Sequence, residues 1–226
     1  MPNIGKTPNS FLSNHQVETC FKSSGHAFVS QRHLNTYMVL SANSVSSTQL
    51  RDFNHHMVEF LRYSTGNPAS YVYTLENDTH LHLNQLLHLP DALLTDFTSL
   101  SRGWLAQCQI PSEDKTLKHF PIAHSGSDAD PILYLKVGLL NRLRYILKGC
   151  DASTASGFGI NAKPQGIVAG KRCGCSQSSQ FLSPEFQSHA RYATLKIAWG
   201  DPHSRTFIPI FPVPEIRSQV HDRTQS

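Results

Sequence analysis

The pattern of apolar and polar positions between residues 36 and 123 predicts four β-strands. Short runs rich in β-branched, aromatic and leucine residues are bounded by polar or turn-forming residues. The second and third runs are joined by Asn77 and Asp78, whose turn chemistry predicts a hairpin. The predicted strands are 36–40, 70–76, 80–89 and 117–123.

Helical spacing of apolar residues predicts three helices in the same part of the chain. Residues 47–63 carry apolar side chains three and four positions apart, with Ser47 or Thr48 as the candidate N-cap. Pro90 suits the first turn of a second helix that runs to about residue 107. A third helix over 131–148 is expected to begin after Asp130 as its cap and to end at a glycine.

The resulting order, β-α-β-β-α-β followed by one more helix, predicts an α+β fold. The first six elements match the ferredoxin-like, split β-α-β arrangement, an antiparallel sheet with both helices on one face. The last helix, which carries Tyr145, is an addition to that layout. Because this fold hosts many functions, the function has to be argued from particular residues.

The two ends of the chain differ in composition from the central part, which we expect to be one domain over 31–175. Residues 1–30 are rich in Ser, Asn and Gly, and we expect a poorly ordered lead-in there. Glycines and prolines punctuate the chain after Gly149. Residues 176–226 are expected to form a loop-rich C-terminal extension.

Composition and charge limit the classes of protein and partner that fit this sequence. Hydrophobic residues make up 39% of 226 residues, enough to build a core. The sequence shows no apolar run long enough to span a bilayer and no signal segment, so we expect a soluble, cytoplasmic protein without a membrane partner. The net charge is +4, and residues 142–172 hold six basic residues against one acid. Such a local excess suits a polyanion, although a solvated basic face gives the same pattern.

The five cysteines are widely spread and odd in number, which favours free thiols over a disulfide framework. Cys173 and Cys175 form a C-x-C pair. A structural zinc site needs a second pair of ligands, so this pair by itself does not predict one.

His80 and His82 form the first group of residues that carries chemistry. Side chains alternate along a strand, so both histidines project from one face, with Leu81 and Leu83 on the other. The hairpin brings the carboxylate of Glu76 near them. Two imidazoles and a carboxylate with open positions suit Mn²⁺ or Mg²⁺ bound to a phosphate. The alternative is a chance pair of half-exposed strand histidines in a chain with 13 histidines.

Tyr145 and Lys148, near the end of the last predicted helix, form the second group. They lie three residues apart and share a helix face with Asn141 and Arg142 one turn earlier. Nearby cations attract a phosphodiester and favour the phenolate form of a tyrosine, which is a known type of covalent nucleophile. The alternative is an amphipathic helix with a boundary tyrosine and a lysine that complements the helix dipole.

Together, the two groups resemble the motifs of the HUH endonucleases, in particular the rolling-circle replication initiators of plasmids and small phages. A His-hydrophobic-His strand, His80-Leu81-His82, precedes a Tyr-x-x-Lys helix, Tyr145 to Lys148, on a ferredoxin-like layout. The resemblance covers about residues 32–175. The segment from Gly170 to Gly174 is also similar to Rep-like proteins of bacterial plasmids and phages.

The resemblance implies a metal-dependent nickase that cuts single-stranded DNA at a replication origin. His80, His82 and Glu76 would hold Mn²⁺ or Mg²⁺, which polarises the scissile phosphate. Tyr145 would form a 5′-phosphotyrosine intermediate, and Lys148 would stabilise charge at the reacting groups. The residues expected to contact DNA are Asn141, Arg142, Lys171 and Arg172.

Departures from the family pattern limit what the resemblance implies. Phage-type initiators often carry two tyrosines on this helix, whereas Asn141 and Gly149 stand four residues before and after Tyr145. Relaxases place their tyrosine ahead of the histidines, so the order here argues against them. The chain has no G-x-x-x-x-G-K-[ST] loop, so a helicase would be a separate protein of the bacterial host cell.

Three other functions are compatible with these residues. A single-strand transposase shares the metal motif and a late tyrosine, although Lys148 favours an initiator. A non-catalytic ferredoxin-like nucleic-acid-binding module would stack bases on aromatic residues of the sheet, for which Tyr37, Tyr71 and Tyr73 are candidates. An inactivated relative would bind an origin without forming a covalent adduct.

Overall fold

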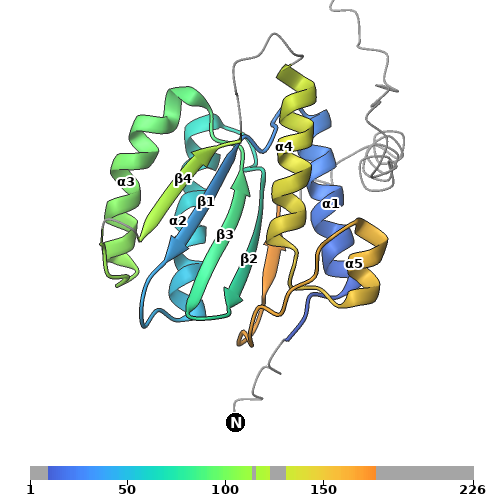
Figure 1. Ribbon diagram of the computed structural model, residues 1–226. Coiled ribbons are helices and arrows are strands. Elements are labelled where there is room, and N and C mark those ends of the chain that lie inside the picture. Colours follow the sequence, from blue (N-terminus) through green and yellow to red (C-terminus); the bar gives the residue numbers. More distant parts are fainter. Residues whose placement is uncertain (1–9, 114–115, 123–130, 177–226) are drawn as a thin grey trace, which may run out of the picture.

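The computed structural model describes residues 10–113, 116–122 and 131–176, which form a five-stranded antiparallel sheet with helices on both faces (Figure 1). The strands are β1 (Thr36–Ser41), β2 (Tyr71–Asn77), β3 (Leu81–Leu87), β4 (Leu117–Pro121) and β5 (Cys173–Cys175). The helices are α1 (Asn14–Val29), α2 (Ser47–Thr65), η1 (Asp91–Leu93), α3 (Leu94–Gln107), α4 (Pro131–Ile146) and α5 (Ala152–Phe158). None of the helices in the described ranges is long and apolar enough to cross a membrane.

The strand order is β4-β1-β3-β2-β5, and each neighbouring pair is antiparallel. The register places Ser41 of β1 and Glu76 of β2 on either side of His82 in β3. Residues that are directly opposite each other in an antiparallel sheet point to the same face. One row of the sheet therefore gathers a hydroxyl, an imidazole and a carboxylate on one face.

The sheet separates two hydrophobic cores, because side chains alternate between its faces. One core lies under α2 and α3 and includes Met38, Leu83, Leu87, Phe53, Met57 and Trp104. The other lies under α1 and α4 and includes Tyr37, Val72, Leu86, Phe21, Leu139 and Leu143. Figure 1 shows α4 running across this second face, which we call the α4 face.

The predicted α+β class is confirmed, and each strand and helix expected between residues 36 and 148 is present with small shifts at its ends. The N-cap of α2 is Ser46, one residue before the expected position, where it forms a capping box with Gln49. The strand expected from residue 80 begins at Leu81, so His80 precedes β3. Asp130, the expected cap of α4, lies outside the described residues.

The poorly ordered lead-in expected over residues 1–30 is wrong for residues 14–29, which form α1. Ser13 accepts a hydrogen bond from the Gln16 amide, and the Gln16 side chain accepts one from the Ser13 amide. This capping box begins α1, whose Val17 and Phe21 are buried in the hydrophobic core on the α4 face of the sheet. Residues 1–9 lie outside the described part of the chain.

The glycine-rich region after residue 149 is more regular than expected, since it contains α5 and β5. Among the described residues, the short β5 pairs with β2 alone, so its formation depends on a neighbour about a hundred residues earlier in the chain. Of the expected C-terminal extension over 176–226, only residue 176 lies within the described residues.

Candidate functional site

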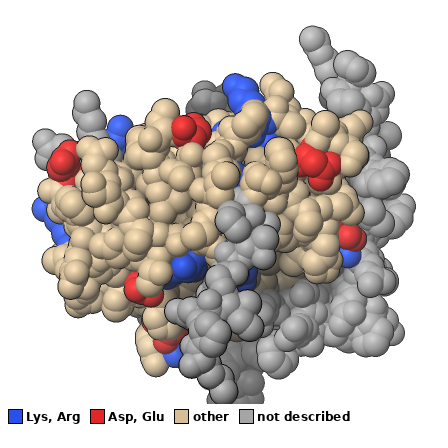
Figure 2. All heavy atoms as spheres, turned by 90° about the horizontal axis from the view of Figure 1, so that it is seen from below, with Lys and Arg blue, Asp and Glu red and all other residues tan. Residues whose placement is uncertain are grey.

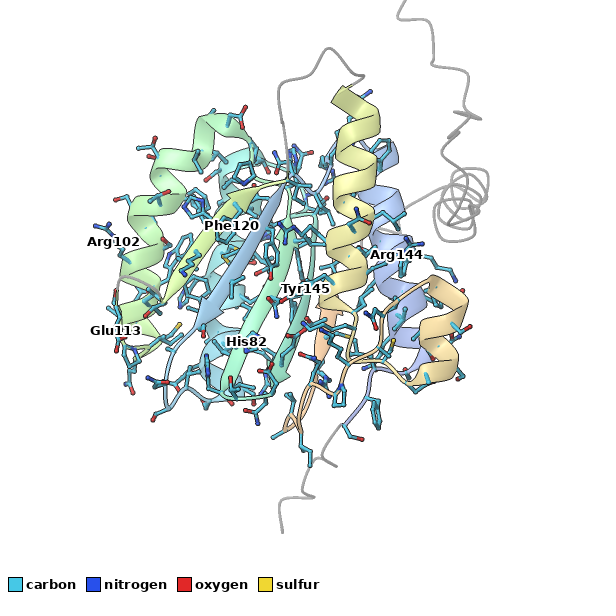
Figure 3. The ribbon with its side chains drawn as sticks, viewed as in Figure 1. His82, Arg102, Glu113, Phe120, Arg144 and Tyr145 are labelled. Carbon is cyan, nitrogen blue, oxygen red and sulfur yellow. The ribbon has the colours of Figure 1, made fainter. Side chains whose placement is uncertain are left out.

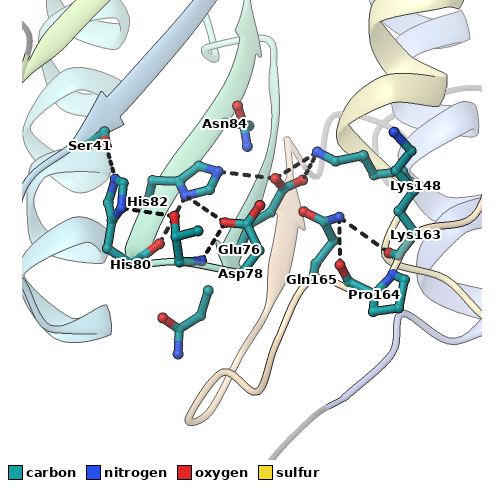
Figure 4. A network of polar contacts seen from close by, with 12 residues as sticks. Ser41, Glu76, Asp78, His80, His82, Asn84, Lys148, Lys163, Pro164 and Gln165 are labelled. Carbon is teal, nitrogen blue, oxygen red and sulfur yellow. Dashed lines mark hydrogen bonds and ion pairs between the residues drawn. The ribbon is translucent and has the colours of Figure 1, made fainter.

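The β2–β3 hairpin and the segment after α4, about seventy residues later in the chain, bring Glu76, His82 and Lys148 together on the α4 face (Figure 4). Glu76 Oε2 lies 3.1 Å from His82 Nε2 across the β2–β3 pair. Lys148, which follows α4, donates to both carboxylate oxygens of Glu76 at 2.7 Å. Glu76 is 2% exposed and Lys148 8% exposed, so the two form a buried charge pair. The imidazole of His82 contacts this charge pair through Glu76 Oε2.

The surroundings of His82 favour its protonated form. Burial of the ring acts against the charge, but hydrogen bonds to Glu76 and to the His80 carbonyl outweigh it and raise the pKa of His82. The two ring nitrogens both face acceptors, because Nδ1 lies 3.1 Å from that carbonyl and Nε2 faces Glu76. A doubly protonated ring therefore satisfies both contacts.

His80 lies beside His82 but is held by different partners. Its Nε2 lies 2.5 Å from the Ser41 hydroxyl and its Nδ1 lies 3.0 Å from the Thr79 hydroxyl. The centroids of the two imidazole rings are 5.8 Å apart. His80 is exposed, so its ring is open to solvent at the edge of the network (Figure 4).

The expected metal ligands have suitable donor chemistry, but they are arranged as a hydrogen-bonded network. In the described ranges, no three His, Cys, Asp or Glu side chains form a group that could hold a metal ion. Both oxygens of Glu76 contact Lys148, and both ring nitrogens of His80 contact hydroxyl groups. A cation bound by His80 and His82 would have to displace the hydroxyl partners of His80 and the Glu76 or carbonyl contact of His82.

Tyr145 lies on the last turn of α4 and belongs to the same cluster (Figure 3). Lys148 Nζ lies 4.0 Å from the centroid of its ring, and the ring meets Tyr37 edge-on at 6.3 Å. The side chain is 48% exposed, so a substrate can approach it. The ammonium of Lys148 thus contacts both the predicted nucleophile and the predicted third metal ligand, Glu76.

Of the four residues expected to contact DNA, three are exposed and one is buried. Asn141, Arg142 and Lys171 are exposed, and the Arg142 guanidinium lies 5.0 Å from the Tyr37 ring centroid. The expectation for Arg172 is wrong, because this side chain is 1% exposed. Its guanidinium donates to backbone carbonyls, so it holds loops together. These carbonyls belong to Ser10 at 2.5 Å, Gly166 at 3.0 Å and Gln165 at 3.1 Å.

The six basic residues between 142 and 172 do not form one open basic face. Lys148 and Arg172 are buried in their contacts, and Arg144 donates to the Phe158 carbonyl. On the side of the molecule seen in Figure 2, Lys and Arg side chains are scattered among acidic and uncharged residues. Any nucleic-acid site must therefore combine a few cations with other types of contact.

The aromatic residues suggested for a base-stacking sheet do not lie together on an open face. Tyr37 belongs to the core under α1 and α4, whereas Tyr73 belongs to the core under α2 and α3. Both are 6% exposed, and Tyr71 is stacked against Tyr73. Sequence reasoning also missed two exposed residues of β4, Lys118 and Phe120, whose position depends on the pairing of β4 with β1.

Comparisons of this chain with protein-family models, with curated proteins and with solved structures found no match. The function therefore has to be inferred from the cluster of Tyr145, Lys148, Glu76 and His82 itself. Any proposed function has to explain why these four residues, from β2, β3, α4 and the segment after α4, meet in one largely buried polar cluster.

Proposed function

We propose that this protein is an HUH-type nickase that cuts single-stranded DNA at a replication origin, with Tyr145 as its nucleophile. The observation that supports this most is the meeting of Tyr145 with Glu76 and His82 through Lys148. The sequence motifs were identified by their order along the chain, which contains no information about distance. Two motifs that matched by chance would have no reason to share one face of a sheet.

The arrangement of strands and helices supports the same proposal. The order β4-β1-β3-β2, with α2 and α3 under one face, agrees with a ferredoxin-like, split β-α-β unit. In this interpretation, β5 extends the sheet at the β2 edge, and α4 carries the tyrosine across the opposite face. His82 on the central strand β3, His80 just before it and the proposed nucleophile on α4 then meet on one face.

In the proposed reaction, the scissile phosphoryl group of the DNA strand is transferred from a 3′-oxygen to the phenolic oxygen of Tyr145. The phenolic oxygen forms a bond to phosphorus, and the bond from phosphorus to the 3′-oxygen breaks. The phenolic proton leaves the tyrosine, and the 3′-oxygen takes up a proton, which leaves a 3′-hydroxyl and a 5′-phosphotyrosine. The phosphotyrosine retains the energy of the original bond, so no nucleotide cofactor is needed for rejoining.

A divalent cation, Mn²⁺ or Mg²⁺, is part of this proposal, and its ligands would be His80, His82 and Glu76. When bound, it would polarise the scissile phosphate. We assign Lys148 a positioning role, because its ammonium already holds the Glu76 carboxylate and lies on the Tyr145 ring. In the proposed setting, the protein acts on origin DNA in the cytoplasm of a bacterial cell, where a host helicase unwinds the duplex.

A covalent-adduct assay with Tyr145→Phe tests the proposal. The protein is incubated with Mn²⁺ and labelled single-stranded oligonucleotides that tile the replicon from which its gene comes. Wild-type protein should give a denaturant-resistant protein–DNA band, and Tyr145→Phe should give none, because only the attacking oxygen is missing. Tyr63→Phe is the control, since Tyr63 is 74% exposed on α2, and it should form the adduct normally. A normal adduct from Tyr145→Phe would remove the nucleophile assignment.

The contact of both Glu76 oxygens with Lys148 supports a second candidate, a relative that binds an origin without cutting it. In such a protein the charge pair would have replaced the metal as the partner of the carboxylate. This candidate gains support if wild-type protein binds the oligonucleotides but forms no adduct on any of them. A single-strand transposase would use the same chemistry, so its distinction rests on the DNA sequence that is cut.

A further inference from the structure

A second group of side chains on the α4 face lies over β1 and β4, next to Tyr145. Tyr37 and Phe120 are directly paired across these strands, and their rings stack at 6.2 Å with an interplanar angle of 25°. Lys118 lies two residues before Phe120 and therefore points to the same face. We call Phe120, Tyr37, Lys118 and Arg142 the β4 platform.

Of the two aromatic rings in the platform, one is buried and the other is accessible to solvent. Tyr37 is only 6% exposed, and its hydroxyl donates a 2.6 Å hydrogen bond to Asn84, which fixes the ring. Phe120, by contrast, is 44% exposed although it stands in a strand of the sheet. An exposed aromatic ring that is backed by a fixed ring can stack against another flat group.

The charged part of the platform is basic. Arg142 holds its guanidinium 5.0 Å from the centroid of the Tyr37 ring, and both Arg142 and Lys118 are exposed. The nearby carboxylate of Glu76 is buried and paired with Lys148, so it contributes little negative charge to this surface. Flat aromatic surface next to exposed cations complements the bases and phosphates of a single strand.

The platform is continuous with the proposed nucleophile. Tyr145 meets Tyr37 edge-on, and Tyr37 in turn stacks on Phe120. In Figure 3, Phe120 on β4 and Tyr145 on α4 lie on the same side of the sheet. A strand whose phosphate reaches Tyr145 therefore has the platform directly beside it.

We propose that Phe120 stacks a base of single-stranded DNA beside the phosphate attacked by Tyr145, while Arg142 and Lys118 contact neighbouring phosphates. This inference rests on the proposed function, because it describes how the substrate lies at the same site. Stacking tolerates any base, so the platform orients the strand without reading its sequence. The platform also requires an unpaired strand, since bases inside a duplex are stacked on each other.

Fluorescence anisotropy with a labelled oligothymidylate of about 12 nucleotides tests the platform. Phe120→Ala should bind about tenfold more weakly than wild type, and Phe120→Trp should restore binding because it restores the ring. The matched control is Tyr63→Ala, which removes an exposed ring from α2 that also has a guanidinium, that of Arg62, 4.4 Å from its centroid. Tyr63→Ala should bind as wild type. Thermal unfolding of each variant establishes that it is folded.

Two results would overturn the platform. The first is equal affinity of Phe120→Ala and wild type for the oligothymidylate. The second is an equal loss of affinity for a duplex of the same length, because a base within a duplex cannot reach Phe120.

The adduct assay on the same preparations separates this inference from the proposed function. An adduct from wild type together with unchanged binding by Phe120→Ala would reject the platform and keep the nickase. Loss of binding by Phe120→Ala together with no wild-type adduct on any strand would keep the platform and reject the nickase.

Discussion

The buried contact between Glu76 and Lys148 is the residue-scale feature on which the site depends. Two short hydrogen bonds offset the cost of taking both charges out of water. If one partner is removed, the other charge remains buried without compensation. The same contact places the lysine ammonium against the Tyr145 ring, so stability and the position of the proposed nucleophile are linked here.

Glu76→Gln should lower the free energy of unfolding by about 3 kcal/mol, because it leaves Lys148 charged and buried without its counter-ion. Urea denaturation measures the change. Glu59→Gln is the control, since Glu59 pairs with Arg62 at the surface and its loss should leave stability nearly unchanged. Equal small effects of both substitutions would show that the buried pair is not stabilising.

Arg172 and Lys171 are adjacent in sequence but should behave oppositely. Arg172→Met should lower the free energy of unfolding by about 2–3 kcal/mol, because the buried carbonyls that the guanidinium satisfies lose their donors. Lys171→Met should leave stability unchanged, since Lys171 is exposed. Paired denaturation curves check both, and a larger effect at Lys171 would contradict the structural role of Arg172.

At the scale of elements, α1 shows how a helix with a polar sequence becomes part of the core. Only one side of α1 is apolar, and it covers β2 and β5 beside α4. Phe21 on this side stacks on Phe158 of α5 with centroids 5.0 Å apart. The helix therefore ties the N-terminal part of the chain to the segment after α4.

Phe21→Ala should lower the free energy of unfolding by about 3–4 kcal/mol, because it removes a buried ring and leaves a cavity. Phe11→Ala removes the same side chain where it is 51% exposed, and it should change stability by less than about 0.5 kcal/mol. Chemical denaturation compares the two. A negligible effect of Phe21→Ala would mean that residues 14–29 do not pack as described.

At the scale of the whole molecule, the sheet separates one hydrophobic core from the face that carries the proposed site. α2 and α3 cover one face with a largely apolar core, in which Gln85 donates a buried hydrogen bond to Asn54, whereas the polar cluster and the β4 platform lie on the α4 face. This division should let the proposed metal-dependent cleavage be separated from the proposed DNA binding, because such binding depends on stacking and phosphate contacts.

Excess EDTA should therefore abolish the covalent adduct while single-stranded DNA binding stays within about twofold of its original affinity. Adduct formation and anisotropy are measured on the same sample, and added Mn²⁺ should restore the adduct. The control is Tyr145→Phe, which should form no adduct with or without Mn²⁺. Undiminished adduct formation in excess chelator would exclude His80, His82 and Glu76 as ligands of a catalytic metal.

The sequence by itself determined the elements from β1 to α4 and the order of the two motifs. Strand alternation and helical spacing depend on residues within a few positions of each other, so they can be seen without a structure. The same local geometry put His82 and Glu76 on one face, because a short hairpin fixes the pairing of its strands. The capping box of Ser13 and Gln16 was an available signal for α1, although the polar composition around it pointed to a loop.

Only the tertiary structure decided which residues meet across long stretches of chain. The pairing of β5 with β2, the burial of Arg172 among carbonyls and the contact of Lys148 with Glu76 all join residues far apart in sequence. The exposure of Phe120 likewise follows from the pairing of β4 with β1 and from the part of the face that α4 covers. Local patterns carry no information about such contacts, because they arise when separate elements pack and exclude water together.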